Sequence, residues 1–511
     1  MKQVRRLNLG PWRRVVRLAF SGSIAVLLLA GLVWGLHDVV SLQAAPSAVS
    51  LHVDDATGHD VPSCGPAVAP CKTISYALVN QADDDDSILI TTGIFSDNLT
   101  VDSLSLTFRG GFTISGTEWV KGTGPTIIDG GGADRVFLIQ DSTAVLEGLT
   151  IRGGVAAAGG GGAQIKRSTV SFSDTVISGN KVTGGDGGGL AAFEDSVVVL
   201  AGVVISDNQV AATATSGRAG GLLVASGSEA TLTDVSVAGN TARAGGGGVF
   251  ASGLQTTVSI SRSRIFSNTT GGAPSGGGGG LEVSQGTLVL ADSTVAGNEA
   301  AGSQGGGLLA SGGSVVSVLR SRFADNLAAE QGGALAAVGS TVSISTALVT
   351  GNETGSGIAN VLAISDTAVT LANSTVAANN PLGDQAVMLW TGSLEVANTI
   401  MWNNGPNLAS GPACPACITV TYSDIQGGWS GYTNKNTDPL FIGGGNYKLG
   451  LGSPCVDAGT NAGALAHDLD GESRLLDGDG DGVATVDIGA YEFRLHRVLL
   501  PLTIRGTTPD W

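Results

Sequence analysis

Charge, aromatic rings and sulfur are all scarce in this chain. Charged residues make up 14% of its 511 positions and aromatic residues 5%, with five histidines, five cysteines and three methionines. The net charge is −17, and no stretch of lysine and arginine forms a basic stripe. Nucleic acid is therefore not expected as a partner, because phosphate binding needs clustered positive charge. The shortage of aromatic side chains also argues against one large globular core.

Glycine, by contrast, is abundant, with 80 residues. Asparagine recurs through the middle of the chain at intervals of about 28 residues, which indicates a repeated structural unit. An apolar residue precedes each asparagine by three positions, from Ile177 to Ile400, and predicts a buried column. We expect each asparagine to close a corner in left-handed backbone geometry. The predicted ladder consists of Asn180, Asn208, Asn240, Asn268, Asn298, Asn326, Asn352, Asn379 and Asn403.

A glycine followed by an aliphatic residue marks a second fixed point, from Gly189-Leu190 to the weaker Gly357-Ile358. The spacing from this aliphatic residue to the next asparagine is nearly constant, whereas the spacing from each asparagine to the following aliphatic residue varies widely. The constant stretch alternates polar and apolar residues, as in Val258-Ser259-Ile260, which is typical of a strand with one buried face. The sequence therefore predicts an all-β parallel solenoid with one variable loop in each turn.

The N-terminal segment, residues 1–48, is of another kind. Several arginines precede an uncharged, apolar stretch from Leu18 to Leu36. A helix over this stretch would be long enough to span a bilayer, so the segment is either a cleaved signal peptide or a retained membrane anchor. Either alternative predicts an extracellular or cell-surface location for the rest of the chain.

Export also bears on the cysteines, because disulfides persist outside the cytoplasm. We expect disulfide bridges between Cys64 and Cys71 and between Cys414 and Cys417. Cys455 then has no partner in the sequence. The latter pair has the spacing of a redox or metal half-site, but it lacks a second cysteine pair and a nearby histidine.

We expect five regions in the chain. The segment from Cys71 to Asn80 has helical apolar spacing and should cover the open N-terminal end of the solenoid. The expected boundaries are 1–48 for the signal or anchor, 49–154 for the N-terminal cap and first coils, 155–425 for the regular repeats, 426–493 for an irregular C-terminal domain and 494–511 for a tail.

These features together resemble a known group. The Cys71-Lys72-Thr73-Ile74 entry and the coils punctuated by asparagine and glycine resemble bacterial right-handed parallel β-helix proteins of the pectate-lyase-like superfamily, including polymorphic outer-membrane adhesins. The segments Tyr422–Ile425, Asp438–Phe441, Ser453–Gly459 and Asp487–Phe493 are similar to the choice-of-anchor domain of type Q. The resemblance implies a right-handed parallel β-helix and a surface location, with attachment through the tail or the N-terminal segment as the only membrane contact.

One constellation suggests ion chemistry. Asp477, Asp479 and Asp481 alternate with glycine, which allows a flexible loop to fold several oxygens around calcium. Asp487 is a weaker fourth candidate, because the EF-hand pattern places its last ligand one residue later. A solvated acidic turn is the alternative.

No catalytic residues can be assigned from the sequence. The variable loops carry few charged side chains, and no Ser/His/Asp arrangement stands at motif spacing. We therefore expect a monomeric structural or adhesive protein that contacts polysaccharide or other components of the cell envelope. The alternative is a calcium-dependent polysaccharide lyase or glycoside hydrolase, which would need acidic and basic side chains to converge in one groove.

Charges six positions before the ladder asparagines alternate in sign through Asp234, Arg262, Asp292 and Arg320. Because the position three before each asparagine faces inward, positions six and four before it should face outward. We predict that these four residues stack as one column over successive turns. The most basic spot, and the candidate for glycan contact, is formed by Arg262, Arg264, Arg320 and Arg322.

Overall fold

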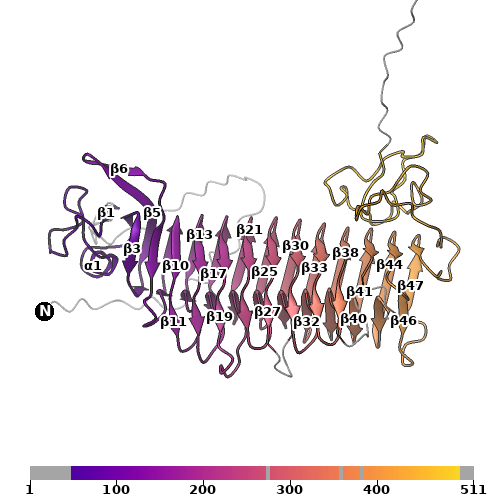
Figure 1. Ribbon diagram of the computed structural model, residues 1–511, viewed down its shortest axis with the longest axis horizontal. Helices are drawn as coiled ribbons and strands as arrows, with labels where there is room; N and C mark the ends of the chain where they lie inside the picture. The colour runs from indigo at the N-terminus through magenta and orange to yellow at the C-terminus, as the bar shows by residue number, and fades with distance from the viewer. Residues whose placement is uncertain (1–47, 272–276, 356–360, 380–384, 495–511) are drawn as a thin grey trace, which may run out of the picture. The chain divides into compact units, whose positions relative to one another are not determined.

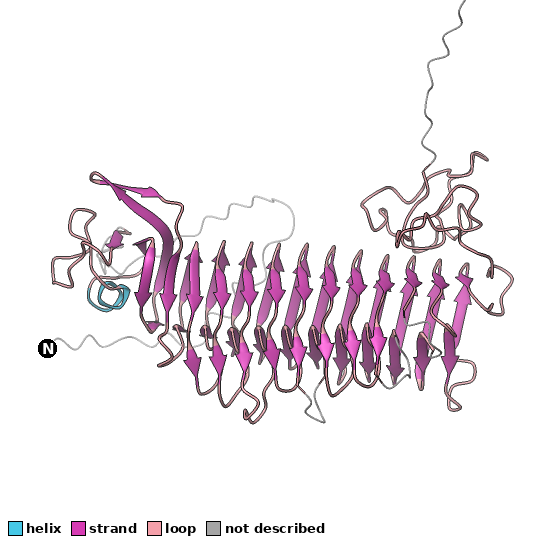
Figure 2. Cartoon of the chain, viewed as in Figure 1, coloured by secondary structure: helices cyan, strands magenta, loops and turns pink. Residues whose placement is uncertain are grey.

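The computed structural model describes residues 48–271, 277–355, 361–379 and 385–494. The expected export segment in residues 1–47, the tail after Arg494 and the glycine-aliphatic pair at Ile358 lie outside this part of the chain. Within it, one helix and four sheets are present, and the strands of successive turns lie side by side (Figure 1, Figure 2). The predicted all-β parallel solenoid is confirmed.

Sheet A contains the longest strands of each turn. From β9 onward its neighbours pair in parallel without a shift of register. The hairpin strand β6 (Glu118–Lys121) pairs antiparallel with β5 alone. In order, the sheet comprises β1 (Ser50–Val53), β2 (Asp86–Thr91), β5 (Ser105–Ser115), β9 (Thr143–Glu147), β13 (Thr169–Ser173), β17 (Val197–Ala201), β21 (Glu229–Thr233), β25 (Thr257–Ser261), β29 (Thr287–Ala291), β33 (Val315–Leu319), β37 (Thr341–Ser345), β41 (Thr367–Ala372), β44 (Gly392–Ala397) and β47 (Ile418–Thr421).

Sheet B follows sheet A in each turn and supplies the central aliphatic column of the core. Ile177, Ile205 and Val237 pair in register along it and are fully buried. Its strands are β3 (Gly93–Ser96), β7 (Thr126–Asp129), β10 (Leu149–Arg152), β14 (Val176–Ser178), β18 (Val204–Ser206), β22 (Ser236–Ala238), β26 (Arg264–Phe266), β30 (Thr294–Ala296), β34 (Arg322–Ala324), β38 (Leu348–Thr350), β42 (Thr375–Ala377), β45 (Ile400–Trp402) and β48 (Asp424–Ile425).

Sheet D is short and precedes the variable loop. Its strands are β11 (Val155–Ala156), β15 (Lys181–Val182), β19 (Gln209–Val210), β23 (Thr241–Ala242), β27 (Thr269–Thr270), β31 (Glu299–Ala300), β35 (Leu327–Ala328) and β39 (Glu353–Thr354).

Sheet C receives the chain after the variable loop and leads back to sheet A. The glycine-aliphatic pairs of the sequence open its central strands, so Leu190, Leu222 and Val249 form a buried column. Leu362 takes the next place after Leu335 in that column. The strands are β4 (Leu99–Asp102), β8 (Phe137–Gln140), β12 (Ala163–Lys166), β16 (Leu190–Phe193), β20 (Leu222–Ala225), β24 (Val249–Ser252), β28 (Leu281–Ser284), β32 (Leu308–Ser311), β36 (Leu335–Val338), β40 (Leu362–Ser365), β43 (Val387–Leu389) and β46 (Leu408–Ser410).

The helix α1 (Ile74–Asn80) covers the N-terminal end of the coil, as its spacing predicts. Thr73 caps it by accepting a hydrogen bond from the Tyr76 N–H. Ile74, Ala77 and Leu78 are buried against the first strands, whereas Val79 is exposed. The apolar end of the first turn is thereby shielded from water.

The asparagine ladder is a continuous chain of buried hydrogen bonds. Asn208 Oδ1 accepts from Asn180 Nδ2 at 3.0 Å and from the Asn180 N–H at 3.1 Å. Asn208 Nδ2 in turn donates to Asn240 Oδ1 and to the backbone oxygen of Ile177. Each interior asparagine therefore forms hydrogen bonds with the asparagines of both adjacent turns. These bonds explain why full burial of the amide is tolerated.

Two parts of the ladder prediction are wrong. The last member is Asn404, which accepts from Asn379 at 2.9 Å, while Asn403 is exposed. The register explains the shift, since Met401 and not Ile400 pairs with Val376. The ladder asparagines also do not take the left-handed conformation. That conformation belongs to the residue before each of them: Gly179, Asp207, Gly239, Ser267, Gly297, Asp325, Gly351, Ala378 and Asn403.

The irregular C-terminal region, residues 426–494, packs on the outward face of sheet B over the last turns. Ile400, which points away from the coil, is fully buried in one cluster with Leu449, Cys455 and Ile488. Thr375 on the preceding turn is also buried and accepts from the Ala490 N–H. A second small hydrophobic core therefore joins this region to the coil.

Candidate functional site

An open groove lies where sheet C passes into sheet A in the first regular turns. Its volume is about 320 Å³. Lys166 at the end of β12, Phe193 at the end of β16 and Asp186 from the loop between β15 and β16 line it. Glu194 follows Phe193 in left-handed backbone and completes the rim. The fold thus gathers an ammonium group, two carboxylates and an aromatic ring around one opening.

Two arginines hold the walls of this groove. Arg135 donates at 2.7 Å and 3.2 Å to two backbone oxygens of the lining loop. Arg167 donates at 2.8 Å and 2.9 Å to the Asp141 carboxylate and forms an ion pair with Glu194. The hydrogen bond from Arg167 lowers the pKa of Asp141. The sequence analysis predicted none of these contacts, although Arg167 lies about one turn of the coil from both Asp141 and Glu194.

A second apolar layer lies on the outward face of sheet C, below the variable loops. Ala191, Leu223 and Phe250 stand in register there and are buried. Glu282 occupies the next place in the column, and its Oε2 is shielded from solvent without a hydrogen-bond partner among the described residues. Burial raises the pKa of Glu282 to about 8, while the positive charge of Arg218 opposes the shift. The carboxyl group is therefore isolated in an apolar setting.

The predicted charged column is present at the corner between sheets A and B. Asp234, Arg262, Asp292 and Arg320 each follow aligned strands, with φ values of 55°, 47°, 50° and 40°. Arg262 pairs with Asp234 at 2.9 Å and Arg320 with Asp292 at 2.7 Å. The hydrogen bond from Arg262 lowers the pKa of Asp234. The stacking prediction is confirmed, and the left-handed backbone of these residues is an addition to it.

The four arginines expected to contact glycans are not equivalent. The charges of Arg262 and Arg320 are balanced within the column. Arg322 donates to the Tyr491 hydroxyl at 2.7 Å and to Asp470 at 3.2 Å, so the C-terminal region occupies it. Arg264 is exposed and lies 5.6 Å from the centre of the Phe266 ring. They do not form one free basic patch, because the C-terminal region covers its far end.

The acidic turn is only partly assembled as predicted. Carboxylate oxygens of Asp477 and Asp479 lie within 4.8 Å of one another and of Asp457, which the sequence did not suggest. Asp481 lies outside this group and accepts from the Val483 N–H. Several backbone N–H groups donate to the cluster, two of them to Asp457 Oδ2 at 2.7 Å and 2.8 Å. The three grouped carboxylates offer hard oxygen ligands of the kind calcium prefers.

Asp487 is not part of that group, because its side chain is buried and accepts hydrogen bonds from backbone N–H groups. It accepts from the N–H groups of Asp457 and Phe493. Its neighbour Glu492 pairs with Arg474 at 2.8 Å, and both partners are buried. Burial raises the pKa of Asp487 to about 7 and that of Glu492 to about 8, and the charge of Asp487 adds to the shift of Glu492.

Arg474 is the residue of this region that sequence reasoning missed most completely. Its guanidinium donates to the backbone oxygens of Asn373 in the coil and of Gly489 and Ala490, each at 3.1 Å. Burial lowers its pKa, against the opposing charge of Glu492. The arginine therefore fastens the C-terminal region to the coil, and no local pattern around it signals that role.

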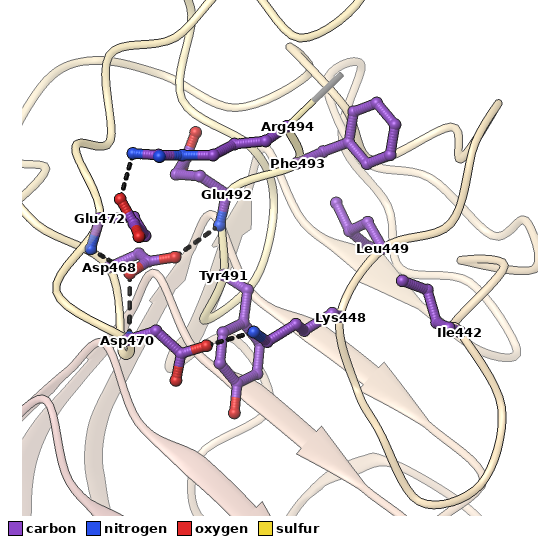
Figure 3. Close-up of a pocket in the computed structure, with 10 residues that line it drawn as sticks. All are labelled: Ile442, Lys448, Leu449, Asp468, Asp470, Glu472, Tyr491, Glu492, Phe493 and Arg494. Atoms are coloured by element: carbon purple, nitrogen blue, oxygen red, sulfur yellow. Dashed lines mark hydrogen bonds and ion pairs between the residues drawn. The ribbon is translucent and has the colours of Figure 1, made fainter. Parts of the chain in front are cut away.

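A cavity of about 220 Å³ lies within the C-terminal region (Figure 3). Acidic side chains and the Tyr491 ring form one side, and Ile442, Leu449 and Phe493 form the other. Lys448 pairs with Asp470 at 2.5 Å. The other ion pairs of this cavity join Glu472 to Arg494 and Glu492 to Arg474.

The cysteines form two local bridges. Cys64 is bonded to Cys71 and Cys414 to Cys417. Cys455 is a buried free thiol that donates to Asp424 Oδ2 at 3.2 Å, and burial raises its pKa above the usual value. Across the described residues, no helix has the length and apolar character needed to cross a membrane.

Known proteins give three similarities of fold. Residues 110–288 match the family model described as a right handed beta helix region. The chain resembles the crystal structure of pectate lyase Pel9A with a TM-score of 0.38 and 12% identity, over 88% of this chain and 98% of that one. The GH136 lacto-N-biosidase from Eubacterium ramulus gives a TM-score of 0.32 and 10% identity, over 74% and 68% of the two chains. No curated protein matches. At TM-scores of 0.38 and 0.32 these two structures carry no argument about this chain.

Proposed function

We propose that this protein, which folds as a right-handed parallel β-helix, is an exported structural or adhesive component. It contacts glycans through the groove at Lys166, Asp186, Phe193 and Glu194. The carrying observation is the convergence of these side chains around one opening of about 320 Å³. That volume is typical of the smaller ligand sites of proteins, which lie between about 300 and 1,000 Å³.

The chemistry of the lining suits sugar rings. Carboxylates, the ammonium group of Lys166 and the amide of Gln164 can exchange hydrogen bonds with hydroxyl groups. Phe193 is half-buried and offers an apolar face for the C–H side of a ring. Because Arg135 and Arg167 already brace the walls, these groups are held in place before a ligand arrives.

Binding is favoured over catalysis by the setting of the two carboxylates. A general acid at neutral pH needs a carboxyl group kept neutral by an apolar environment. Glu194 is exposed and paired with Arg167, and Asp186 is half-buried and accepts from the Arg218 N–H at 2.7 Å. The convergence of acids with Lys166 nevertheless favours the polysaccharide lyase or hydrolase as the second candidate, since that activity needs such a meeting point.

A glycan panel tests the proposal. The purified full-length chain is measured against acidic and neutral polysaccharides for binding and for release of reducing ends. Lys166→Glu and Glu194→Gln are expected to weaken binding at least tenfold. Lys181→Glu is the matched control, because Lys181 lies on sheet D and outside the groove. Binding that survives both groove variants contradicts the proposal, and new reducing ends replace it with the enzymatic candidate.

Export is part of the same proposal. It rests on the apolar segment that follows the N-terminal arginines. Cell fractionation is expected to place the chain outside the cytoplasm, and N-terminal sequencing then distinguishes a cleaved signal from a retained anchor. A chain recovered only from the cytoplasm contradicts it.

A further inference from the structure

The outward face of sheet A is long, regular and almost uncharged. Each five-residue strand points three side chains outward, so the seven strands from β13 to β37 present 21 of them. Glu229 is the only charged residue among these, and none is aromatic. The others are threonine, serine, valine, alanine and one leucine, and Val199 and Val315 are 40% and 51% exposed.

Charged residues border this face along both edges. Asp234, Arg262, Asp292 and Arg320 line the edge toward sheet B. The Asp141, Arg167 and Glu194 group lies at the edge toward sheet C. Thirteen of the 21 outward side chains are serine or threonine, so the centre of the face is neutral rather than apolar. The core of a protein interface likewise carries few charges, and its rim is polar.

We infer that the outward face of sheet A is the contact surface for a second copy of this chain. The two coils pack face to face with antiparallel axes, about a two-fold axis that runs along the strand direction between β25 and β29. Such an isologous contact needs only one surface that is complementary to itself. This replaces the monomer that the sequence alone suggests.

The area of the face is adequate for this role. Eight strands from β13 to β41, each of five or six residues, lie symmetrically about the proposed axis and cover roughly 16 by 38 Å, or about 600 Å² from each copy. The two copies together would bury about 1,200 Å², above the roughly 1,000 Å² expected of a biological interface. The unbroken register of these strands keeps the surface regular enough for close contact.

The charged column supplies the complementarity that selects this arrangement. Rotation about the proposed axis reverses the order of turns, so Asp234 of one copy faces Arg320 of the other and Arg262 faces Asp292. The alternation of sign along the column therefore places unlike charges opposite each other at four points. A parallel pair of coils would instead set this column against the opposite edge of the other copy and lose the match.

Oligomeric state tests the inference directly. Light scattering and sedimentation of the full-length chain are expected to give twice the chain mass at micromolar concentration. Ser259→Glu, near the proposed axis, should raise the dissociation constant at least tenfold. Arg262→Glu should weaken the dimer by opposing Asp292, and the double variant Arg262→Glu, Asp292→Arg should recover it. Arg264→Glu, on sheet B, is the control and should remain dimeric. A wild-type monomer, an unaffected Ser259→Glu variant, or a double variant that fails to recover overturns the proposal.

Discussion

The outward residues of sheet B form one column that is exposed in the earlier turns and buried in the later turns. We call the earlier turns the bare half of the coil and the later turns, on which the C-terminal region packs, the covered half. In the earlier turns Val204, Ser236 and Arg264 face solvent, and Val204 is 36% exposed. In the later turns the equivalent residues Thr375 and Ile400 are fully covered by the C-terminal region. The strands and their register are alike in both halves. Alternation along a strand therefore decides which side chains point outward, but not whether they stay in water.

The largest difference between the halves should come from Arg474, which fastens the covered half. Arg474→Leu leaves Glu492 and the backbone oxygens of Asn373, Gly489 and Ala490 without their buried donor. This should destabilise the C-terminal region by about 3–5 kcal/mol. Chemical denaturation together with limited proteolysis measures the loss. The bare half offers a control in Arg243→Leu, whose side chain makes one weak contact at 3.4 Å. Equal stability of the two variants would contradict the assignment.

The covered half should also respond to pH. The pKa values of Asp487 and Glu492 are raised to about 7 and 8, so the folded chain keeps protons that the unfolded chain releases above about pH 4. Stability should therefore fall as pH rises toward 8 and then level off, by up to about 1.4 kcal/mol per pH unit for each carboxyl. Thermal melts between pH 5 and 9 check this. Glu492→Gln should flatten the slope, and an unchanged slope would contradict the explanation.

The contribution of the asparagine ladder to the free energy of unfolding should not depend on whether the C-terminal region covers the outward face of sheet B. Asn268→Ala in the bare half and Asn352→Ala in the covered half each leave buried groups unpaired and should cost about 1–3 kcal/mol per group. The two losses in unfolding free energy are expected to agree. Asn403→Gly is the matched control, because Asn403 is exposed and left-handed and should lose little. A large difference between the two ladder variants would show that the cover supports the core.

Two arginines at the same outward position provide a smaller contrast. Arg322→Ala removes the hydrogen bonds to Tyr491 and Asp470 and should cost about 1–3 kcal/mol. Arg264→Ala, in the bare half, should change the unfolding free energy by less than about 0.5 kcal/mol. Denaturation curves of the two variants and the wild type measure the two changes in unfolding free energy. Equal effects would mean that the contact of Arg322 contributes no net stability.

The smallest expected effect concerns calcium in the C-terminal region. If Asp457, Asp477 and Asp479 bind the ion, saturating calcium should raise the Tm by a few degrees, because a ligand of the folded state stabilises it. Asp477→Asn should abolish the shift. Asp481→Asn should keep it, since Asp481 lies outside the group. A Tm that does not respond to calcium leaves a plain acidic turn.

Much of the coil was accessible from the sequence because its contacts repeat. Strand pairs join residues about one turn apart, so one spacing predicts the ladder and the column from Asp234 to Arg320 together. The error at Asn403 arose because two asparagines stand side by side, and only the pairing of Met401 with Val376 selects the second. A period alone cannot resolve a shift of one residue.

The sequence by itself determined the repeat, the inward and outward faces and the cysteine pairs, since each depends on neighbours close in the chain or one period away. Only the tertiary structure decided that Arg474 reaches Asn373, that Asp457 joins Asp477, and that Lys166 meets Asp186 in one groove. The physical reason is distance along the chain. Contacts of the irregular C-terminal region and the variable loops obey no period, and packing of the folded coil alone brings their partners together.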